Sequence, residues 1–190
     1  MEVVIVRHGE TEWSRARRHT GRTDVPLTER GRDVAEAAGA ALAGRRFALV
    51  LVSPLGRARE TARLAGYGEQ AQVRDDLLEW DYGEQEGLTT AEIRRARPGW
   101  TVWDPGPSGG ETVAQVGERA DHVIAELRAA EGDCLVFAHG HLLRILAARW
   151  LGLPPVDGAL LALDPATISI LGYEHERPVI RAWNALCVPR

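Results

Sequence analysis

Residues 3–9 read Val-Val-Ile-Val-Arg-His-Gly, a run of four β-branched apolar residues followed at once by two basic side chains and a glycine. Continuous apolar runs of this length are typical of parallel strands that are buried on both faces. Residues 47–52 (Phe-Ala-Leu-Val-Leu-Val) and residues 134–138 (Cys-Leu-Val-Phe-Ala) have the same character. The sequence therefore predicts a sheet that contains three buried strands.

Helical patterns follow the predicted strands and fill the stretches between them. Thr28 and Ser53 are predicted as N-caps, and Pro54 suits the first position of a helix. The stretches that begin at Thr89 and Thr112 fit the capping box, in which a Glu or Gln three residues later returns a hydrogen bond to the N-cap. The predicted helices cover residues 28–43, 54–64, 90–97, 113–130 and 141–151.

Strands that alternate with helices predict an α/β protein. Near the C-terminus, residues 167–171 and 178–183 flank a turn-like stretch, so we expect these two strands to form an antiparallel hairpin. The predicted fold is a three-layer α/β/α sandwich with a mostly parallel sheet and this antiparallel C-terminal hairpin. The length of 190 residues favours a single domain over residues 1–190, with a small cap-like segment at about 75–110.

The composition argues against several kinds of function. With 23 basic and 27 acidic residues the formal net charge is −4, which disfavours nonspecific nucleic-acid binding. All 23 basic residues are arginines, so no lysine can form a Schiff base or serve a P-loop. No apolar run approaches membrane-spanning length, and the N-terminus lacks signal-peptide features. Cys134 and Cys187 are too few for a disulfide framework. We expect a cytoplasmic protein, a monomer or homodimer, with no nucleic-acid or membrane partner.

Polar residues with a shared chemistry follow the three predicted strands. In open α/β sheets, ligands bind beyond the carboxyl ends of the strands. Arg7 and His8 follow the first strand, Arg57 lies one turn into the helix after the second, and His139 follows the third. A histidine can act as a nucleophile, and the planar fork of arginine pairs with phosphate oxygens. Two histidines with two arginines suggest phosphoryl transfer through a phosphohistidine.

A metal site is not expected in this set of residues. His139 and His141 stand two positions apart and should point away from each other, and no Asp or Glu completes a ligand set. The sequence therefore predicts chemistry without a metal or other cofactor.

The chain resembles the histidine phosphatase superfamily, which includes the cofactor-dependent phosphoglycerate mutases. Four stretches carry the resemblance in the family's order: Arg-His-Gly-Glu-Thr at 7–11, Ser-Pro-Leu-Gly-Arg-Ala-Arg-Glu-Thr at 53–61, Glu-Trp-Asp-Tyr-Gly at 79–83 and Phe-Ala-His-Gly at 137–140. One tripeptide would be weak evidence, whereas four ordered motifs are strong. Further likenesses, such as Thr-Gly-Arg-Thr-Asp at 20–24, are similar to a branch that holds bacterial acid phosphatases and sedoheptulose-1,7-bisphosphatase.

This resemblance implies roles for five residues. His8 would be the nucleophile, and Arg7, Arg57 and His139 would hold the phosphoryl oxygens. Glu79 would protonate the leaving alcohol and then activate water. Composition alone would place Glu79 in a solvated acidic loop, so its selection depends on the motif.

The resemblance also suggests residues that contact the substrate. Small hydroxyls also occur in loops and caps, and tryptophans also pack in cores, so structural roles compete with binding roles here. The candidates are Ser14, Gly21, Thr23, Ser53, Tyr82, Trp100, Trp103, Gly140, Arg144 and His175.

Two departures from the mutase pattern favour hydrolysis. Ser14 stands where mutases usually carry an asparagine, and the segment between Gly87 and Gly109 is short. An open site admits water, which turns a phosphoenzyme into a phosphatase. We therefore expect a phosphomonoesterase, an acid or sugar phosphatase, that acts on a small phosphorylated metabolite. The alternatives are a bisphosphoglycerate-dependent phosphoglycerate mutase and a non-catalytic phosphate-binding module.

Overall fold

The computed structural model describes residues 1–186 and contains a six-stranded sheet in the order β3-β2-β4-β1-β5-β6. Four strands are parallel: β1 (Val3–Arg7), β2 (Leu49–Val52), β3 (Gln72–Val73) and β4 (Cys134–Ala138). The last two, β5 (Ile168–Glu174) and β6 (Arg177–Ala185), are antiparallel, β5 to β1 and β6 to β5. The predicted mostly parallel sheet with an antiparallel C-terminal hairpin is confirmed. Cys187 lies outside the described residues.

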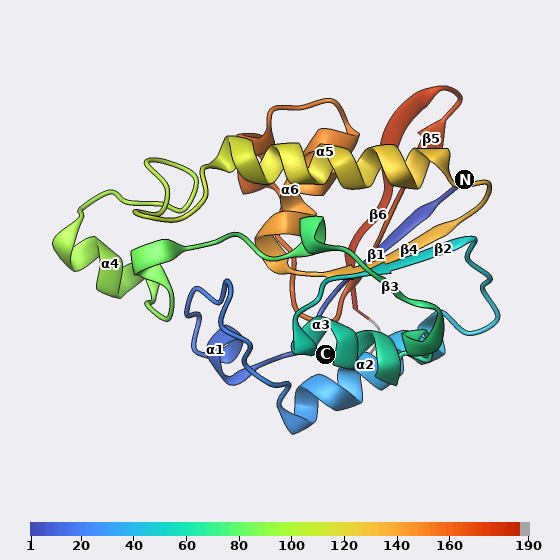
Figure 1. Cartoon of the computed structure of the whole chain (residues 1–190), viewed down its shortest axis with the longest axis horizontal. Helices are drawn as coiled ribbons and strands as arrows, with labels where there is room; N and C mark the ends of the chain where they lie inside the picture. The colour runs from blue at the N-terminus through green and yellow to red at the C-terminus, as the bar shows by residue number, and fades with distance from the viewer. Residues whose placement is uncertain (187–190) are drawn as a thin grey trace.

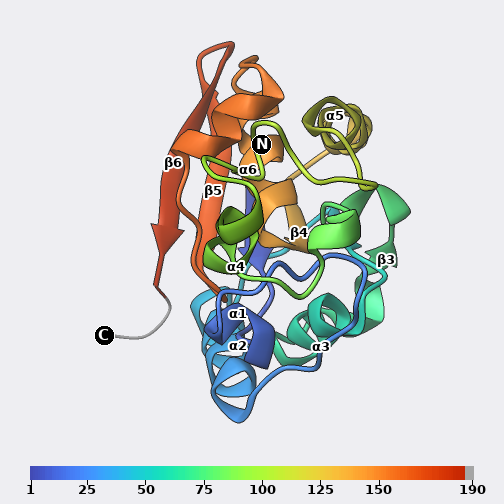
Figure 2. The ribbon, with the colours of Figure 1, turned by 90° about the vertical axis from the view of Figure 1, so that its left-hand side faces the viewer.

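Alternation along the buried strands explains the three layers. Successive side chains of a strand point to opposite faces, so a run that is apolar throughout needs a cover on both faces. Val4 and Val6 of β1 belong to the core that includes Ala38 of α2 (Glu29–Ala41) and Ala58 of α3 (Gly56–Leu64). Val3 and Ile5 face the opposite core, under α5 (Val113–Ala129) and α6 (Gly140–Trp150). Figures 1 and 2 show these helix pairs on the two sides of the sheet.

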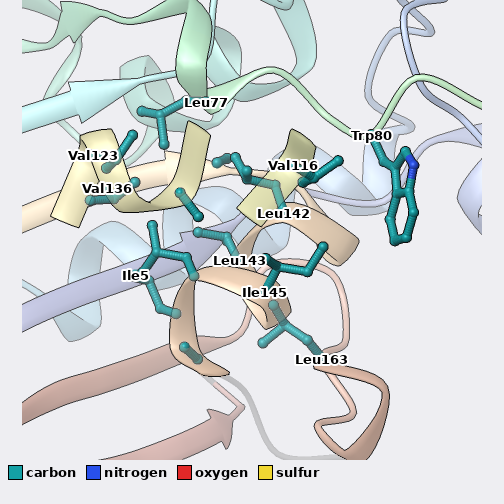
Figure 3. Packing of buried hydrophobic residues seen from close by; sticks show 14 of the residues in the cluster. Ile5, Leu77, Trp80, Val116, Val123, Val136, Leu142, Leu143, Ile145 and Leu163 are labelled. Atoms are coloured by element: carbon teal, nitrogen blue, oxygen red, sulfur yellow. The ribbon is translucent and has the colours of Figure 1, made fainter. Parts of the chain in front are cut away.

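The larger core is built on α6. Leu142, Leu143 and Ile145 of this helix are fully buried and pack beside Ile5 and Val136 of the sheet (Figure 3). Full burial of a side chain of this size contributes about 1.5–3 kcal/mol relative to exposure. This packing fixes the N-terminus of α6 against the sheet, immediately after His139.

Further short elements lie outside the three layers. They are α1 (Glu12–Arg15), α4 (Thr90–Ala96) and the 3₁₀ helices Gly68–Gln70, Asp75–Leu77, Gly83–Gln85 and Pro155–Leu160. Both predicted capping boxes are confirmed, at Thr89 of α4 and Thr112 of α5. The segment with α4 extends beyond the carboxyl end of β1, on the left in Figure 1, and α1 lies on the same side. No helix among residues 1–186 is long and apolar enough to cross a membrane.

Three sequence expectations differ from the structure. The helix predicted from Ser53 begins at Gly56, with Leu55 at the N-cap position and no side-chain cap. The Ser53 hydroxyl bonds His139 and accepts the N–H of Leu55, which precedes the helix, so it does not cap α3. Strand β3 and helix α1 were not predicted, since each is only two to four residues long.

Candidate active site

Strand register brings the three predicted motifs together. Arg7 of β1 pairs with Ala138 of β4, and Val52 of β2 pairs with Phe137. The next residue of each strand continues the ladder, because the His8 N–H donates to the Ala138 carbonyl at 2.9 Å and the Ser53 N–H donates to the Phe137 carbonyl at 3.0 Å. His8, Ser53 and His139 therefore meet at one edge of the sheet, and the rings of His8 and His139 lie 5.1 Å apart.

The geometry of His8 fixes which ring nitrogen is reactive. His8 Nδ1 lies 2.7 Å from the carbonyl oxygen of Gly9. A carbonyl only accepts, so Nδ1 carries the proton and the lone pair of the neutral ring is on Nε2. Burial, and then the charges of Arg57 and Arg7, lower the pKa of His8 well below its ordinary value. His8 is therefore neutral near pH 7, as a nucleophile must be.

Arg57 is buried beside His8 and braces the loop at residues 20–23. Its guanidinium donates to the carbonyls of Thr20, Gly21 and Thr23 at 3.1, 2.7 and 2.8 Å. The carboxylate of Asp24 forms an ion pair with Arg57, 3.6 Å from its Nη1. The side chain is thus held in place before any ligand arrives. Gly21 and Thr23 act here through their backbone.

Three buried nitrogen atoms around His8 have no partner among residues 1–186. They are Nε of Arg7, Nε of Arg57 and Nδ1 of His139. Buried donors without partners are rare in folded proteins, so a group of them indicates an acceptor that the chain itself does not supply. Two of the three belong to cations, which suits an anionic acceptor. Arg7 also donates Nη1 to the carbonyl of Leu163.

Ser53 holds His139 in place. Its hydroxyl lies 2.7 Å from Nε2 of His139, and both side chains are fully buried. Burial, with Arg57, His8 and Arg7, lowers the pKa of His139 well below its ordinary value, so this ring is also neutral. A neutral ring that accepts the Ser53 proton on Nε2 carries its own proton on Nδ1, which makes that nitrogen a donor.

Glu79 is held by three backbone donors. Its Oε1 accepts the N–H groups of Trp80 at 2.9 Å and Leu142 at 3.0 Å, and Oε2 accepts the N–H of His141 at 3.1 Å. The last two donors belong to the first turn of α6, whose N-terminal end favours a carboxylate. Each carboxylate oxygen has two lone pairs, so Oε2 can still take up a proton.

A cavity of about 300 Å³ contains much of the predicted site. The predicted residues that line it are Arg7, His8, Ser14, Glu79, Tyr82, Gly140 and Arg144. Gly140 allows Arg7 to approach closely, because a Cβ there would stand 3.3 Å from the Arg7 guanidinium. A larger cavity of about 390 Å³ lies beside α3 and β3 and contains none of the predicted site residues, so we place the site in the smaller one.

Tyr82, His19 and His141 also line the cavity, and Trp103 packs against Arg144 of its wall. The Tyr82 hydroxyl lies 2.6 Å from Nδ1 of His141, and the Arg144 guanidinium lies 4.8 Å from the centroid of Trp103. Burial lowers the pKa of His19 to about 4 and that of His141 well below its ordinary value, so both rings are neutral. Trp100, by contrast, is a core residue, 1% exposed, that donates its indole N–H to the Gly106 carbonyl.

The structure does not bring His175 to the cavity, and we correct that prediction. His175 is exposed in the turn between β5 and β6. Since β5 is antiparallel to β1 and Leu171 pairs with Val3, this turn lies beyond the amino end of β1. His8 follows the carboxyl end of β1, so His175 is at the opposite edge of the sheet.

Several residues that line the cavity were missed from the sequence: Arg17, Arg18, His19, Thr20, His141, Leu163, Asp164 and Pro165. His141 had a signal, since it lies two residues after His139 and starts a helix at a strand end. Asp164 had none, because it lies in an irregular stretch. Backbone contacts hold this stretch at the site: the Ala166 N–H donates to the carbonyls of Arg7 and His8, and the Leu163 carbonyl accepts from Arg7.

Comparison with known proteins agrees with this geometry. Residues 3–186 match the family model of the histidine phosphatase superfamily, branch 1. The chain belongs to the histidine phosphatase superfamily. This histidine phosphatase is an enzyme that hydrolyses phosphate esters.

Named relatives and a solved structure support the assignment. The histidine phosphatase is 44% identical over 177 residues to an acid phosphatase of Mycobacterium tuberculosis, covering 91% of this chain and 87% of that one. It is 37% identical over 182 residues to sedoheptulose 1,7-bisphosphatase of Saccharomyces cerevisiae, covering 79% and 67%. The solved structure of a functionally characterised open reading frame of M. tuberculosis superposes with a TM-score of 0.93 at 41% identity, covering 98% of each chain. The branch predicted from the motifs is confirmed.

Proposed function

We propose that this histidine phosphatase hydrolyses the phosphomonoester of a small metabolite through a phosphohistidine on His8. One observation carries the proposal. A buried, neutral His8 has its lone pair on Nε2 and lies among three side chains that each hold one buried nitrogen without a partner within residues 1–186, two of them arginines. Such donors stabilise charge on phosphoryl oxygens as the transition state develops.

The reaction has two steps. In the first, His8 Nε2 forms a bond to phosphorus, the bond from phosphorus to the alcohol oxygen breaks, and Glu79 gives that oxygen its proton. In the second, the Glu79 carboxylate takes a proton from water, the water oxygen bonds to phosphorus, and the bond to Nε2 breaks. Inorganic phosphate leaves, and His8 returns to its neutral form. Arg7, Arg57 and His139 hold the phosphoryl oxygens throughout.

The cavity favours a small polar substrate such as a sugar phosphate. Its volume of about 300 Å³ suits a compact ester, and its outer wall combines the ring of Tyr82 with the guanidinium of Arg144. Relatives named acid phosphatase and sedoheptulose 1,7-bisphosphatase support this class of substrate. We place the enzyme in the cytoplasm, where such metabolites occur, with a small molecule as its partner.

The test compares two histidine variants in phosphate release from p-nitrophenyl phosphate and from glycerol 3-phosphate. His8→Ala removes the nucleophile and should lower kcat/KM by about 10³-fold or more. His122→Ala is the matched control, because the His122 side chain is 72% exposed on α5, and it should retain wild-type activity. More than a tenth of wild-type activity in His8→Ala would refute the covalent route.

A further inference from the structure

Arg17 is a strained and unpaired cation at the cavity. Its φ is 55°, in the left-handed region that side chains other than glycine rarely adopt. Arg17 is exposed and lines the same cavity as His8. Among residues 1–186, no hydrogen bond or ion pair is made by its guanidinium.

The neighbours of Arg17 impose its conformation. On one side, Ser14 closes the capping box of α1, and the Arg17 N–H donates to the Ser14 carbonyl at 3.1 Å. On the other side, Arg18 donates from Nη1 to the Gly87 carbonyl at 2.6 Å, and the His19 N–H donates to the Leu88 carbonyl at 2.9 Å. Backbone strain of this kind persists where the surroundings over-determine it, and it clusters at functional sites. A glycine here would be free of the strain, yet the chain carries an arginine.

Each of the other arginines on the cavity wall already makes at least one hydrogen bond within the chain. Arg7 donates to the Leu163 carbonyl, and Arg18 to the Gly87 carbonyl and the Glu92 carboxylate. Arg144 donates to the carbonyls of Gly158 and Ala159, at 3.0 and 3.1 Å, and lies over Trp103.

The two acidic groups on the cavity wall have partners of their own. Glu79 accepts three backbone N–H groups, and Asp164 accepts the side-chain amide of Asn184 at 3.0 Å. The free Nε of Arg7 is assigned to the reacting phosphate, so within the described residues Arg17 is the cation on this wall whose guanidinium has no other partner.

We propose that Arg17 binds a second anionic group on the substrate, a carboxylate or a second phosphate on the part that leaves as the alcohol. This inference rests on the proposed function, since it places the reacting phosphate at His8. The guanidinium fork pairs with either anion through two parallel hydrogen bonds. The preferred substrates are then phosphomonoesters that carry two anionic groups.

The test uses two pairs of substrates that differ in the second anion. Racemic 3-phosphoglycerate and racemic glycerol 3-phosphate differ by a carboxylate in place of a hydroxymethyl group. Fructose 1,6-bisphosphate and fructose 1-phosphate differ by the second phosphate. Arg17→Gly should lower kcat/KM for the doubly anionic member about five- to tenfold relative to its partner, as expected for an exposed charge-assisted pair.

Two further variants and one second readout make the test specific. Arg17→Lys keeps the charge and should retain most of the preference, whereas Arg15→Ala, two residues earlier, should leave the ratio unchanged. Arg15 is the matched control because it is exposed on α1, pairs with Glu12 and does not line the cavity. Arg17→Gly should also raise the melting temperature, since glycine adopts a positive φ without strain.

Each outcome decides the question. A fall confined to the 3-phosphoglycerate pair assigns a carboxylate, and a fall confined to the fructose pair assigns a phosphate. An unchanged ratio in both pairs, or equal losses on both members of each pair, would overturn the role of Arg17. The proposed function fails separately, if the wild-type enzyme releases phosphate from none of the four esters.

Discussion

Glu79→Gln separates proton donation from pocket shape. The amide keeps the size of the side chain and cannot donate the proton that an alkoxide needs. We expect kcat/KM for glycerol 3-phosphate to fall about 10²–10⁴-fold, the usual contribution of a general acid. For p-nitrophenyl phosphate the fall should be less than about tenfold, because p-nitrophenolate departs without a proton. The parameter kcat/KM is the right one, because it reports the steps up to departure of the leaving group.

The structure also predicts what this substitution does to stability. The carbonyl oxygen of the introduced amide can replace Oε1 of Glu79 and accept the N–H groups of Trp80 and Leu142, now at 2.9 and 3.0 Å. The NH₂ group of the amide then faces the His141 N–H, which donates to Oε2 at 3.1 Å in the wild type. One partly buried donor loses its acceptor, so the free energy of unfolding should fall by up to about 1–3 kcal/mol.

The assay is stopped-flow release of p-nitrophenol together with steady-state phosphate release. Phosphoenzyme hydrolysis loses its base in Glu79→Gln, so p-nitrophenyl phosphate should give a burst equal to the enzyme concentration, followed by a slow steady state. Glu84→Gln is the control, because Glu84 is exposed and does not line the cavity. Equal losses of kcat/KM on both substrates would refute proton donation by Glu79, and Asp81 would then be tested as the acid.

Three further predictions concern cofactors, pH and Arg57. Activity should survive excess EDTA, because Arg7 and Arg57 supply the positive charge at the phosphoryl oxygens; loss with EDTA and recovery with Mg²⁺ or Zn²⁺ would contradict this. It should not need bisphosphoglycerate, because each hydrolytic cycle returns His8 to its neutral form. Burial lowers the pKa of His8 and of His139 in the folded protein, whereas both protonate near pH 6.5 when unfolded, so stability falls as pH drops below 6.5, by up to about 2 kcal/mol for each by pH 5. Urea unfolding at pH 7 and 5 of wild type and His139→Gln checks this, and an equal pH dependence in the two proteins would contradict it. Arg57→Lys should lower the free energy of unfolding by at least about 2 kcal/mol, because one ammonium cannot reach the three carbonyls to which the guanidinium donates. An unchanged urea midpoint would show that these three hydrogen bonds do not stabilise the loop at residues 20–23.

The sheet and the residues at its strand ends were predictable for a physical reason. A strand buried on both faces must be apolar throughout, so β1, β2 and β4 leave a clear pattern in the sequence. Ligand-binding residues gather where such strands end, which places His8 and His139 together without knowledge of the structure. Strand β3 left no pattern, because both of its residues are exposed and only pairing with β2 defines it.

Other features depend on contacts that residue identity does not encode. Arg57 is held by backbone carbonyls of the loop at residues 20–23, and any residue carries a carbonyl. Ser53 is a residue type that both caps helices and binds side chains, and only the position of His139 decides between the two. His175 was assigned by resemblance, and the direction of β5 against β1 was needed to place it at the opposite edge.

The most direct test of the account is to trap the phosphoenzyme. Wild-type enzyme is mixed with ³²P-labelled p-nitrophenyl phosphate, quenched in alkali within milliseconds and digested, and the labelled peptide is sequenced. The account predicts label on His8 that is stable in base and labile in acid, and no label in His8→Ala. Label on a serine, or stoichiometric label in His8→Ala, would contradict nucleophilic attack by His8.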